Sequence, residues 1–218
     1  MRRPRSLKAR REHAAALSPL LAELYPSLKV SLDWETPLEL TVATVLSAQC
    51  TDERVNQVTK TLFPAYPDAS AYADADLDEL KEAVRPTGFF NNKAKNLKGL
   101  GARLVEAYGG EVPDTMEELL TLPGVARKTA NVVLSNAFDT HVGVVVDTHV
   151  KRVAYRLGLT SETDPVKIEQ DLMKVLPQGE WHAFPWRLIL HGRTVCHARS
   201  PRCDECPLAD QCPSAGKV

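Results

Sequence analysis

The chain has few aromatic residues, almost no net charge and no long apolar run. Aromatic residues make up 6% of its 218 residues, and the formal net charge is −1. A helix that crosses a membrane needs about 20 consecutive apolar residues, and no stretch approaches that length. The basic N-terminus is not followed by a signal-type apolar core, because Glu23 interrupts the run. These absences exclude a membrane-spanning protein and a polycation, and favour a cytoplasmic protein with no membrane partner.

Strand patterns are also nearly absent. Residues 142–146 form the only strand-like run, and a single strand makes no sheet. Elsewhere apolar residues recur at helical spacing, and Thr51 and Thr115 stand where N-caps belong, with Glu118 completing a predicted capping box. The sequence therefore predicts an all-α chain, with helices within 31–48, 51–63, 70–84, 91–110, 115–122, 127–138, 146–159, 165–176 and 178–193.

The charges are segregated although they nearly cancel. Cations gather in 2–11, 93–103 and 187–202, and acids gather in 74–82. Such segregation permits a nucleic-acid-binding face on a neutral protein. The alternative for any one block is a solvated helix face or, at the N-terminus, a frayed tail.

Four of the five cysteines fall in one short loop near the C-terminus, spaced C-x6-C-x2-C-x5-C; they are Cys196, Cys203, Cys206 and Cys212. Disulfides are not expected in a chain without an export signal, so clustered thiols indicate a metal. One close pair flanked by single cysteines favours an iron–sulfur cluster. Zinc, which usually takes two close pairs, is the alternative. Cys50 stands apart and is expected to be a buried apolar residue.

The stretch "LPGVARKTANVVL", residues 122–134, predicts two helices joined by a tight Pro-Gly turn. Gly124 allows the turn, and the start of the second helix is an anion site suited to a DNA phosphate, reinforced by Arg127. Lys128 lies opposite the apolar stripe of that helix. A neighbouring cation lowers the pKa of a lysine and favours the nucleophilic free amine. The alternative is an ordinary solvated lysine.

Two polar residues follow in "VDTH". Asp147 occupies an N-cap position, which fixes its carboxylate without excluding a chemical role. His149 is either a phosphate or cap contact or a plain surface histidine.

Taken together, "LPGVARKTANVVL", "VDTH" and the cysteine loop resemble the endonuclease III family of bifunctional DNA glycosylases and AP lyases. "LSAQCTDERVN" and "TGFFNNKAKNL" extend the likeness over nearly the whole chain. The resemblance implies two all-α domains with a DNA cleft between them. One is a six-helix barrel at 30–140, with the helix–hairpin–helix at 115–138. The other joins 1–29 to 141–218 and carries a [4Fe–4S] cluster in loop 196–212.

The resemblance also assigns roles to residues. Lys128 and Asp147 match the catalytic pair, and the four clustered cysteines match the cluster ligands. Gln49 and Phe89 match residues that enter the DNA stack where the damaged base leaves. Further DNA contacts are expected from Gly124, Val125, Arg127, His149, Arg199 and Arg202.

The chain departs from the family's pattern at three places. Ala126 stands where the hairpin often has a second glycine, Phe89 replaces an aliphatic wedge, and the spacing between Lys128 and Asp147 is slightly longer. A change at Ala126 is expected to be tolerated if that residue is helical.

The function that the resemblance implies is removal of oxidised pyrimidines from double-stranded DNA. Lys128 would attack the sugar, form a Schiff base and promote β-elimination, and the enzyme would also act at abasic sites. A monomer associated with the bacterial-type nucleoid is expected. The alternatives are a pyrimidine-dimer glycosylase with AP lyase activity and a non-catalytic DNA-binding module. An adenine glycosylase is disfavoured, since that enzyme lacks the lysine.

Overall fold

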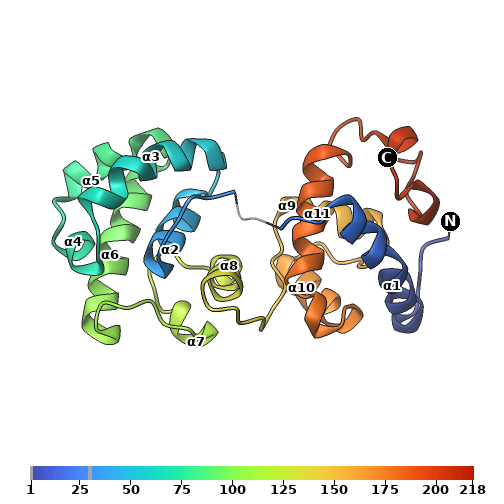
Figure 1. Cartoon of the computed structure of the whole chain (residues 1–218), viewed down its shortest axis with the longest axis horizontal. Coiled ribbons are helices and arrows are strands. Elements are labelled where there is room, and N and C mark those ends of the chain that lie inside the picture. The colour runs from blue at the N-terminus through green and yellow to red at the C-terminus, as the bar shows by residue number, and fades with distance from the viewer. Residues whose placement is uncertain (1, 29–30) are drawn as a thin grey trace. The chain divides into compact units, whose positions relative to one another are not determined.

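The computed structural model describes residues 2–28 and 31–218, and every regular element in these ranges is a helix (Figure 1). The predicted all-α class is confirmed, and residues 142–146 are not a strand. The chain divides into two compact units: unit 1 comprises Met1–Lys29 and Gly143–Val218, and unit 2 comprises Val30–Val142. Their assignment as a cluster domain and a barrel domain stays a prediction.

Unit 2 contains seven described α-helices, which are α2 (Pro37–Leu46), α3 (Asp52–Ala65), α4 (Ala69–Asp74), α5 (Leu77–Val84), α6 (Phe90–Tyr108), α7 (Met116–Leu119) and α8 (Arg127–Ala137). A short 3-10 turn, η1 (Arg85–Thr87), joins α5 to α6. Helices α4 and α5 pack on α6, α7 packs on α8, and α2 packs against α8. The long α6 and the buried α2 therefore each pack against several other helices of the unit.

Helix α2 begins later than the apolar pattern suggests. Thr36 Oγ1 accepts from the Glu39 N–H at 3.2 Å, and the Glu39 carboxylate accepts from the Thr36 N–H at 3.3 Å. This capping box, followed by proline in the first turn, starts the helix at Pro37. Every residue from Leu40 to Leu46 is buried, so α2 is a central helix enclosed on all sides.

The predicted caps agree with the structure in most details. Thr51 caps α3 by accepting from the Arg54 N–H, and α6 ends at Gly109 in the left-handed region. Thr115 caps α7 through the Glu118 N–H at 3.3 Å. The second half of its predicted capping box differs, because the Thr115 hydroxyl itself donates to the Glu118 carboxylate at 2.7 Å.

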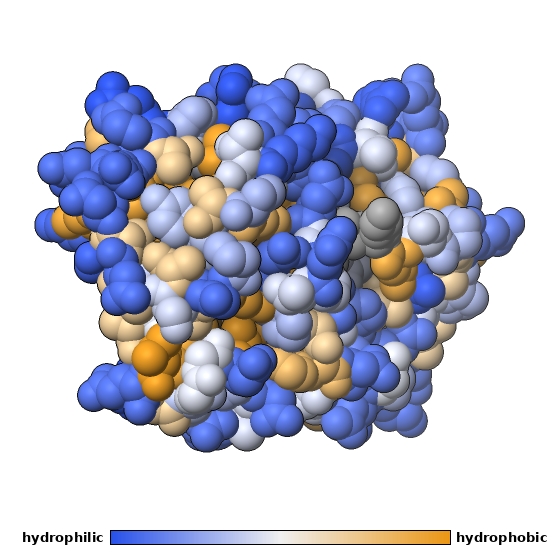
Figure 2. All heavy atoms as spheres, turned by 60° about the vertical axis from the view of Figure 1, so that its left-hand side comes forward, coloured by the Kyte–Doolittle hydropathy of each residue, from blue (hydrophilic) through white to orange (hydrophobic). Residues whose placement is uncertain are grey.

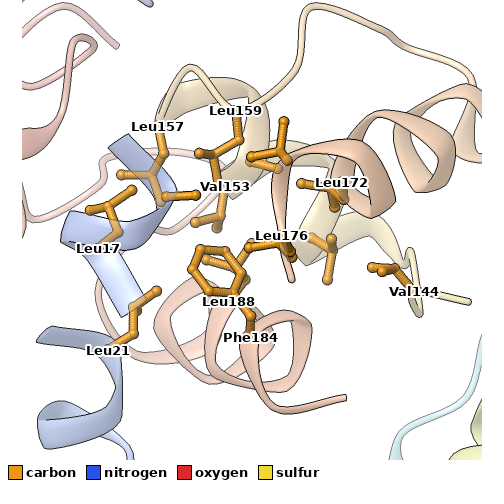
Figure 3. Packing of buried hydrophobic residues seen from close by; sticks show 14 of the residues in the cluster. Leu17, Leu21, Val144, Val153, Leu157, Leu159, Leu172, Leu176, Phe184 and Leu188 are labelled. Atoms are coloured by element: carbon orange, nitrogen blue, oxygen red, sulfur yellow. The ribbon is translucent and has the colours of Figure 1, made fainter. Parts of the chain in front are cut away.

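Unit 1 contains α1 (Leu7–Leu24), α9 (Thr148–Arg156), α10 (Pro165–Val175) and α11 (Ala183–Thr194). Their apolar faces meet in one core, drawn in Figure 3, with Leu17 and Leu21 from α1, Val153 from α9, Leu172 from α10, and Phe184 and Leu188 from α11. Burying such side chains stabilises the fold by about 1.5–3 kcal/mol each. The N-terminal helix is thereby joined to the C-terminal half of the chain.

The basic N-terminus is not a frayed tail. Ser6 caps α1, and Arg10 pairs with Asp171 of α10 at 3.1 Å. Arg11 donates to the Lys174 carbonyl at 2.8 Å. Part of this basic block therefore holds α1 against α10.

The helix expected over 178–193 is wrong at its start. Residues 178–180 form a 3-10 turn, η2 (Gln178–Glu180), and α11 begins only at Ala183. Pro185 explains the break. A continuous helix would place its missing N–H in the interior, whereas a start at Ala183 puts Pro185 in the first turn, where no N–H is needed.

Within the described residues, no helix is both long enough and apolar enough to cross a membrane. Hydrophilic side chains cover most of the face in Figure 2.

Candidate functional site

The hairpin between α7 and α8 is a tightly anchored turn. The Val125 N–H donates to the Leu122 carbonyl at 3.1 Å, and both side chains are buried. Gly124 has φ +80°, and a Cβ there would lie 2.9 Å from the Cβ of Asn96 on α6. Only glycine fits, because the backbone is left-handed and the neighbour is too close. Since the Val125 side chain faces the core, only its backbone can contact a phosphate.

Lys128 lies in the first turn of α8 and is exposed, while Ala130, Val133 and Leu134 on the same helix are fully buried. The predicted orientation of Lys128 away from the apolar stripe is confirmed. Arg127 beside it is half-buried. The first backbone bond of α8 runs from the Ala130 N–H to the Ala126 carbonyl at 2.9 Å, so the positive end of the helix dipole lies at these cations. That arrangement is suited to an anion.

Ala126 is the N-cap of α8 and is extended, with φ −95° and ψ 169°, rather than helical. The sequence predicts that alanine is tolerated at this position if the residue is helical, and that condition is not met. Alanine nevertheless fits, because any L-residue adopts this backbone conformation.

Gln49 and Phe89 share an unusual backbone. Gln49 lies in the turn between α2 and α3, and Phe89 is the N-cap of α6; their φ angles are +55° and +49°. Both side chains are exposed, Phe89 by 62%. A left-handed conformation costs roughly 1–2 kcal/mol for a residue with a side chain. Strained exposed residues of this kind are typical of functional sites.

In unit 1, Asp147 is the N-cap of α9, as predicted from its position. Its Oδ1 accepts from the Val150 N–H at 2.8 Å, and the residue is half-buried. His149 is held nearby, since its Nδ1 lies 3.1 Å from the Arg152 guanidinium. The ring also fits against α11, where a Cβ on Gly192 would lie 2.9 Å from its Nδ1.

Lys128 belongs to unit 2 and Asp147 to unit 1. The structure brings hairpin residues together in one unit and the capped aspartate with the cysteine loop in the other. The pairing of Lys128 with Asp147 stays a prediction.

The four clustered cysteines line one pocket. Its other walls are mostly apolar and include Val153 of α9 and Leu157, the C-cap of that helix. Among the described residues, no group of three or more His, Cys, Asp and Glu side chains is placed to hold a single metal ion. Four cysteine thiolates that line one pocket are the ligand set that an iron–sulfur cluster takes.

Electrostatics also favours a positively charged group at this pocket. Burial raises the pKa of the Cys206 and Cys212 thiols, and the charge of the neighbouring cysteines adds to the shift. Four thiolates so close together would repel one another, so their deprotonated forms need positive charge between them. Iron supplies that charge. The residues present thus fit a [4Fe–4S] cluster.

Two arginines of α9 hold the cysteine loop, and the sequence analysis did not identify them. Arg156 donates to the Cys196 Sγ at 3.3 Å and to the His197 carbonyl at 2.7 Å. Arg152 donates to the carbonyls of Cys196 and Gly192. Their spacing of four residues places both on one helix face, a signal that becomes informative only once the loop is known to lie there.

The two loop arginines expected to contact DNA differ in their surroundings. Arg199 and Arg202 are both exposed. The Arg202 guanidinium donates to the Thr194 carbonyl and lies 3.7 Å from the Glu205 carboxylate. Arg202 therefore already contacts the end of α11 and a carboxylate of its own loop.

Comparison with known proteins identifies two family models. Residues 42–178 match the HhH-GPD superfamily base excision DNA repair protein, and residues 196–212 match the iron-sulfur binding domain of endonuclease III.

Similar proteins cover most of the chain. Endonuclease III of Synechocystis sp. is 57% identical over 92% of this chain and 92% of its own length. Endonuclease III of Bacillus subtilis is 46% identical over 85% and 84%. Among solved structures, a non-covalent endonuclease III–DNA complex matches with TM-score 0.89, and a trapped endonuclease III–DNA covalent intermediate matches with TM-score 0.90. Each is 42% identical, covering 94% of this chain and 96% of that chain.

Proposed function

The chain belongs to the endonuclease III family of the HhH-GPD base excision DNA repair superfamily, and we propose that Lys128 and Asp147 carry out its DNA glycosylase and AP lyase reactions. The observation that carries the proposal is Lys128 itself. It is an exposed amine in the first turn of α8, directly after the anchored Gly124 turn.

Double-stranded DNA with a damaged base or an abasic site is the partner. The backbone at Gly124 and Val125 and the cation Arg127 contact a phosphate at the positive end of the α8 dipole. Arg199 and Arg202 reach phosphates from the cysteine loop. The damaged base leaves the stack at a cost of a few kcal/mol. Gln49 fills the gap by hydrogen bonding and Phe89 by stacking.

The chemistry begins with Lys128 as a free amine. Its nitrogen lone pair forms a bond to the sugar carbon that bears the base, and the bond between sugar and base breaks, with the electron pair leaving on the base. Loss of the amine proton and opening of the sugar ring give an imine. The imine acidifies the adjacent sugar carbon. Removal of its proton expels the 3′ phosphate by β-elimination, and water then releases Lys128 from the imine.

Asp147 acts on the charges that develop during these reaction steps. Its carboxylate either stabilises the positive charge that develops on the sugar ring or takes the proton from Lys128. The hydrogen bond from the Val150 N–H to Oδ1 fixes the carboxylate orientation before substrate binds.

Cys196, Cys203, Cys206 and Cys212 would hold the [4Fe–4S] cluster, whose iron ions would bind the four thiolates and give a rigid centre to the loop that carries Arg199 and Arg202. Oxidised pyrimidines are the proposed substrates, with pyrimidine dimers as the alternative. The enzyme acts as a monomer in the cytoplasm, at the nucleoid.

Borohydride trapping tests the assignment of Lys128. The wild type, mixed with a duplex that carries an abasic site or an oxidised pyrimidine, is expected to give a covalent adduct. Lys128→Ala should give none, because no imine forms. Lys60→Ala, which changes an exposed lysine of α3, should give the wild-type yield. An undiminished adduct from Lys128→Ala would remove Lys128 from the mechanism.

The same assay separates the substrate classes. Parallel duplexes that carry an oxidised pyrimidine, a pyrimidine dimer or a mispaired adenine rank the alternatives by single-turnover rate. DNA binding without any adduct from the wild type would indicate the non-catalytic module.

A further inference from the structure

Lys93 is a buried lysine in a segment whose other cations are more accessible. It lies near the start of α6 and is only 4% exposed. Its Nζ donates to the carbonyls of Leu46 and Thr87, each at 2.8 Å. Burial lowers the pKa of Lys93, and the nearby Cys50 opposes the shift. Cys50, which the sequence predicts to be buried, is half-buried.

The location of Lys93 needs a compensating interaction. A cation near a helix N-terminus meets the positive end of the dipole, and a buried ammonium loses its hydration. The Leu46 carbonyl offsets both effects, since Leu46 is the last residue of α2 and its carbonyl lies at the negative end of that helix. The ammonium is thus matched to a helix C-terminus on one side and to a turn on the other.

The two carbonyls belong to the two segments that carry the strained residues. Leu46 precedes Gln49 by three residues, and Thr87 precedes Phe89 by two. Local bonds shape each turn separately: the Cys50 N–H donates to the Ser47 carbonyl, and the Thr87 hydroxyl donates to the Val84 carbonyl. These bonds stay within one segment. The Lys93 ammonium joins the two segments to each other.

A left-handed backbone at a residue with a side chain persists only where the surroundings hold it. Gln49 and Phe89 each carry this strain and are exposed, whereas Leu46 and Thr87, whose carbonyls accept from Lys93, are buried. By joining the segment before Gln49 to the segment before Phe89, the Lys93 ammonium sets the distance between the two side chains. Such preorganisation matters for an insertion step, because a misplacement of about 1 Å costs on the order of 10²-fold in rate.

We propose that Lys93 is a positioning residue that clamps the Gln49 turn to the Phe89 turn, so that both side chains enter the duplex together when the damaged base leaves. This inference rests on the proposed insertion roles of Gln49 and Phe89. Lys93 touches neither substrate nor reacting atoms. Its effect is therefore expected in base extrusion and not in imine formation by Lys128.

Two substrates separate these steps. A duplex with an oxidised pyrimidine requires extrusion and gap filling, whereas a single-stranded oligonucleotide with an abasic site presents no stack to fill. Lys93→Met keeps the length of the side chain and removes its donors. We expect it to lower the single-turnover glycosylase rate on the duplex by about 10²-fold. Borohydride trapping on the single strand should stay within about threefold of the wild type.

A double-mutant cycle tests whether Lys93 acts through the wedge. Phe89→Ala removes the ring that Lys93 positions, so adding Lys93→Met to Phe89→Ala should slow the duplex reaction much less than Lys93→Met does alone. Lys95→Met is the matched control, since Lys95 is exposed two residues further along α6. At saturating enzyme it should leave the rate unchanged.

Three results would overturn the inference: a Lys93→Met rate equal to that of Lys95→Met, equal losses on duplex and single strand, or additive effects in the cycle. If Lys93→Met does not fold, Lys93→Gln, which retains an amide donor, is judged by the same criteria. Failure of the proposed function gives a different result, because the wild type itself would then form no adduct on either substrate.

Discussion

At the scale of single residues, Asp147 is held by a hydrogen bond from a backbone N–H. The Val150 N–H binds Oδ1 at 2.8 Å, which caps α9 and fixes the carboxylate. The buried residues Val144, Val145 and Val146 hold the chain just before it. The cap depends on a side-chain oxygen, whereas the proposed chemistry depends on the negative charge. Replacing the carboxylate by an amide separates the two roles, because the amide keeps a side-chain oxygen and removes the negative charge.

Asp147→Asn should preserve the fold and lose most of the activity. Asparagine caps helices about as well as aspartate, so the free energy of unfolding should change by less than about 0.5 kcal/mol. Removing the charge should lower the single-turnover glycosylase rate by about 10²-fold or more, the usual contribution of a positioned acid–base or charged group.

Urea unfolding and single-turnover kinetics on the same preparations provide the comparison. Asp147→Ala, which removes both cap and charge, should also lose about 1 kcal/mol of stability. An Asp147→Asn enzyme with wild-type kinetics would mean that the charge has no role in the reaction.

At the scale of elements, α6 organises unit 2 along its length. Phe89 caps its start, and Lys93 follows in its first turns. Asn96 packs on Gly124, and Gly99 lies where a Cβ would be 3.2 Å from Pro123. The same helix, α6, therefore positions both Phe89 and the hairpin turn. Farther along, Gly101 allows α4 to approach.

The α4–α6 contact predicts a strong effect of a single methyl group. A Cβ at Gly101 would lie 2.6 Å from the Ala69 carbonyl oxygen and from the Tyr72 Cβ. Both belong to α4, where little can yield, so Gly101→Ala should destabilise the protein by about 1–3 kcal/mol. Gly179→Ala is the control, because nothing lies within 4 Å of its added Cβ.

Denaturant unfolding measures this difference as a lower midpoint at unchanged slope. Gly179→Ala should be neutral or slightly stabilising. Equal stability of the two variants would show that α4 moves away from α6 at little cost.

At the scale of the whole molecule, many cations of this nearly neutral chain bind the protein itself. Arg10 pairs with α10, Lys93 is buried, and Lys98 donates to the Ala75 carbonyl. Arg156 supports the cysteine loop. Block counts along the sequence therefore overstate the cations that are available to DNA. The stability of the whole chain also depends on titratable groups within it.

His13 makes stability depend on pH. The buried ring of this α1 residue donates from Nε2 to the Leu157 carbonyl at 2.9 Å, and burial lowers its pKa. Below the unfolded pKa of about 6.5, the unfolded chain binds a proton that the folded chain does not. Stability is therefore lost as the pH falls from about 6.5 toward the lowered folded pKa.

The measurement is the melting temperature of the wild type and His13→Gln between pH 7.5 and 5.5. Glutamine keeps an amide donor and does not titrate in this range. The wild type should lose more stability than the variant on acidification, by about 1.4 kcal/mol per unit of pKa shift. Parallel curves for the two proteins would contradict the prediction. Burial also lowers the pKa of His191. Because both proteins contain this residue, its contribution cancels in the difference.

Local patterns in the sequence determined much of this protein. The helical class, the N-caps at Thr51 and Asp147, the Gly124 turn and the cysteine loop each depend on residues close together in the chain. Their physical causes, which are hydrogen bonds to nearby N–H groups, backbone freedom at glycine and the chemistry of thiols, act over a few residues. Such features are predictable without tertiary structure.

Tertiary structure alone decided how residues distant in sequence are used. Lys93 looks like any other cation of its block, but its ammonium reaches a carbonyl 47 residues away. Arg156 meets Cys196 only because α9 packs on α11. The left-handed backbones of Gln49 and Phe89 are against the local preference of both residue types. A conformation or charge that is unfavourable locally is stable only where distant groups compensate for it, and those groups come together only in the folded chain.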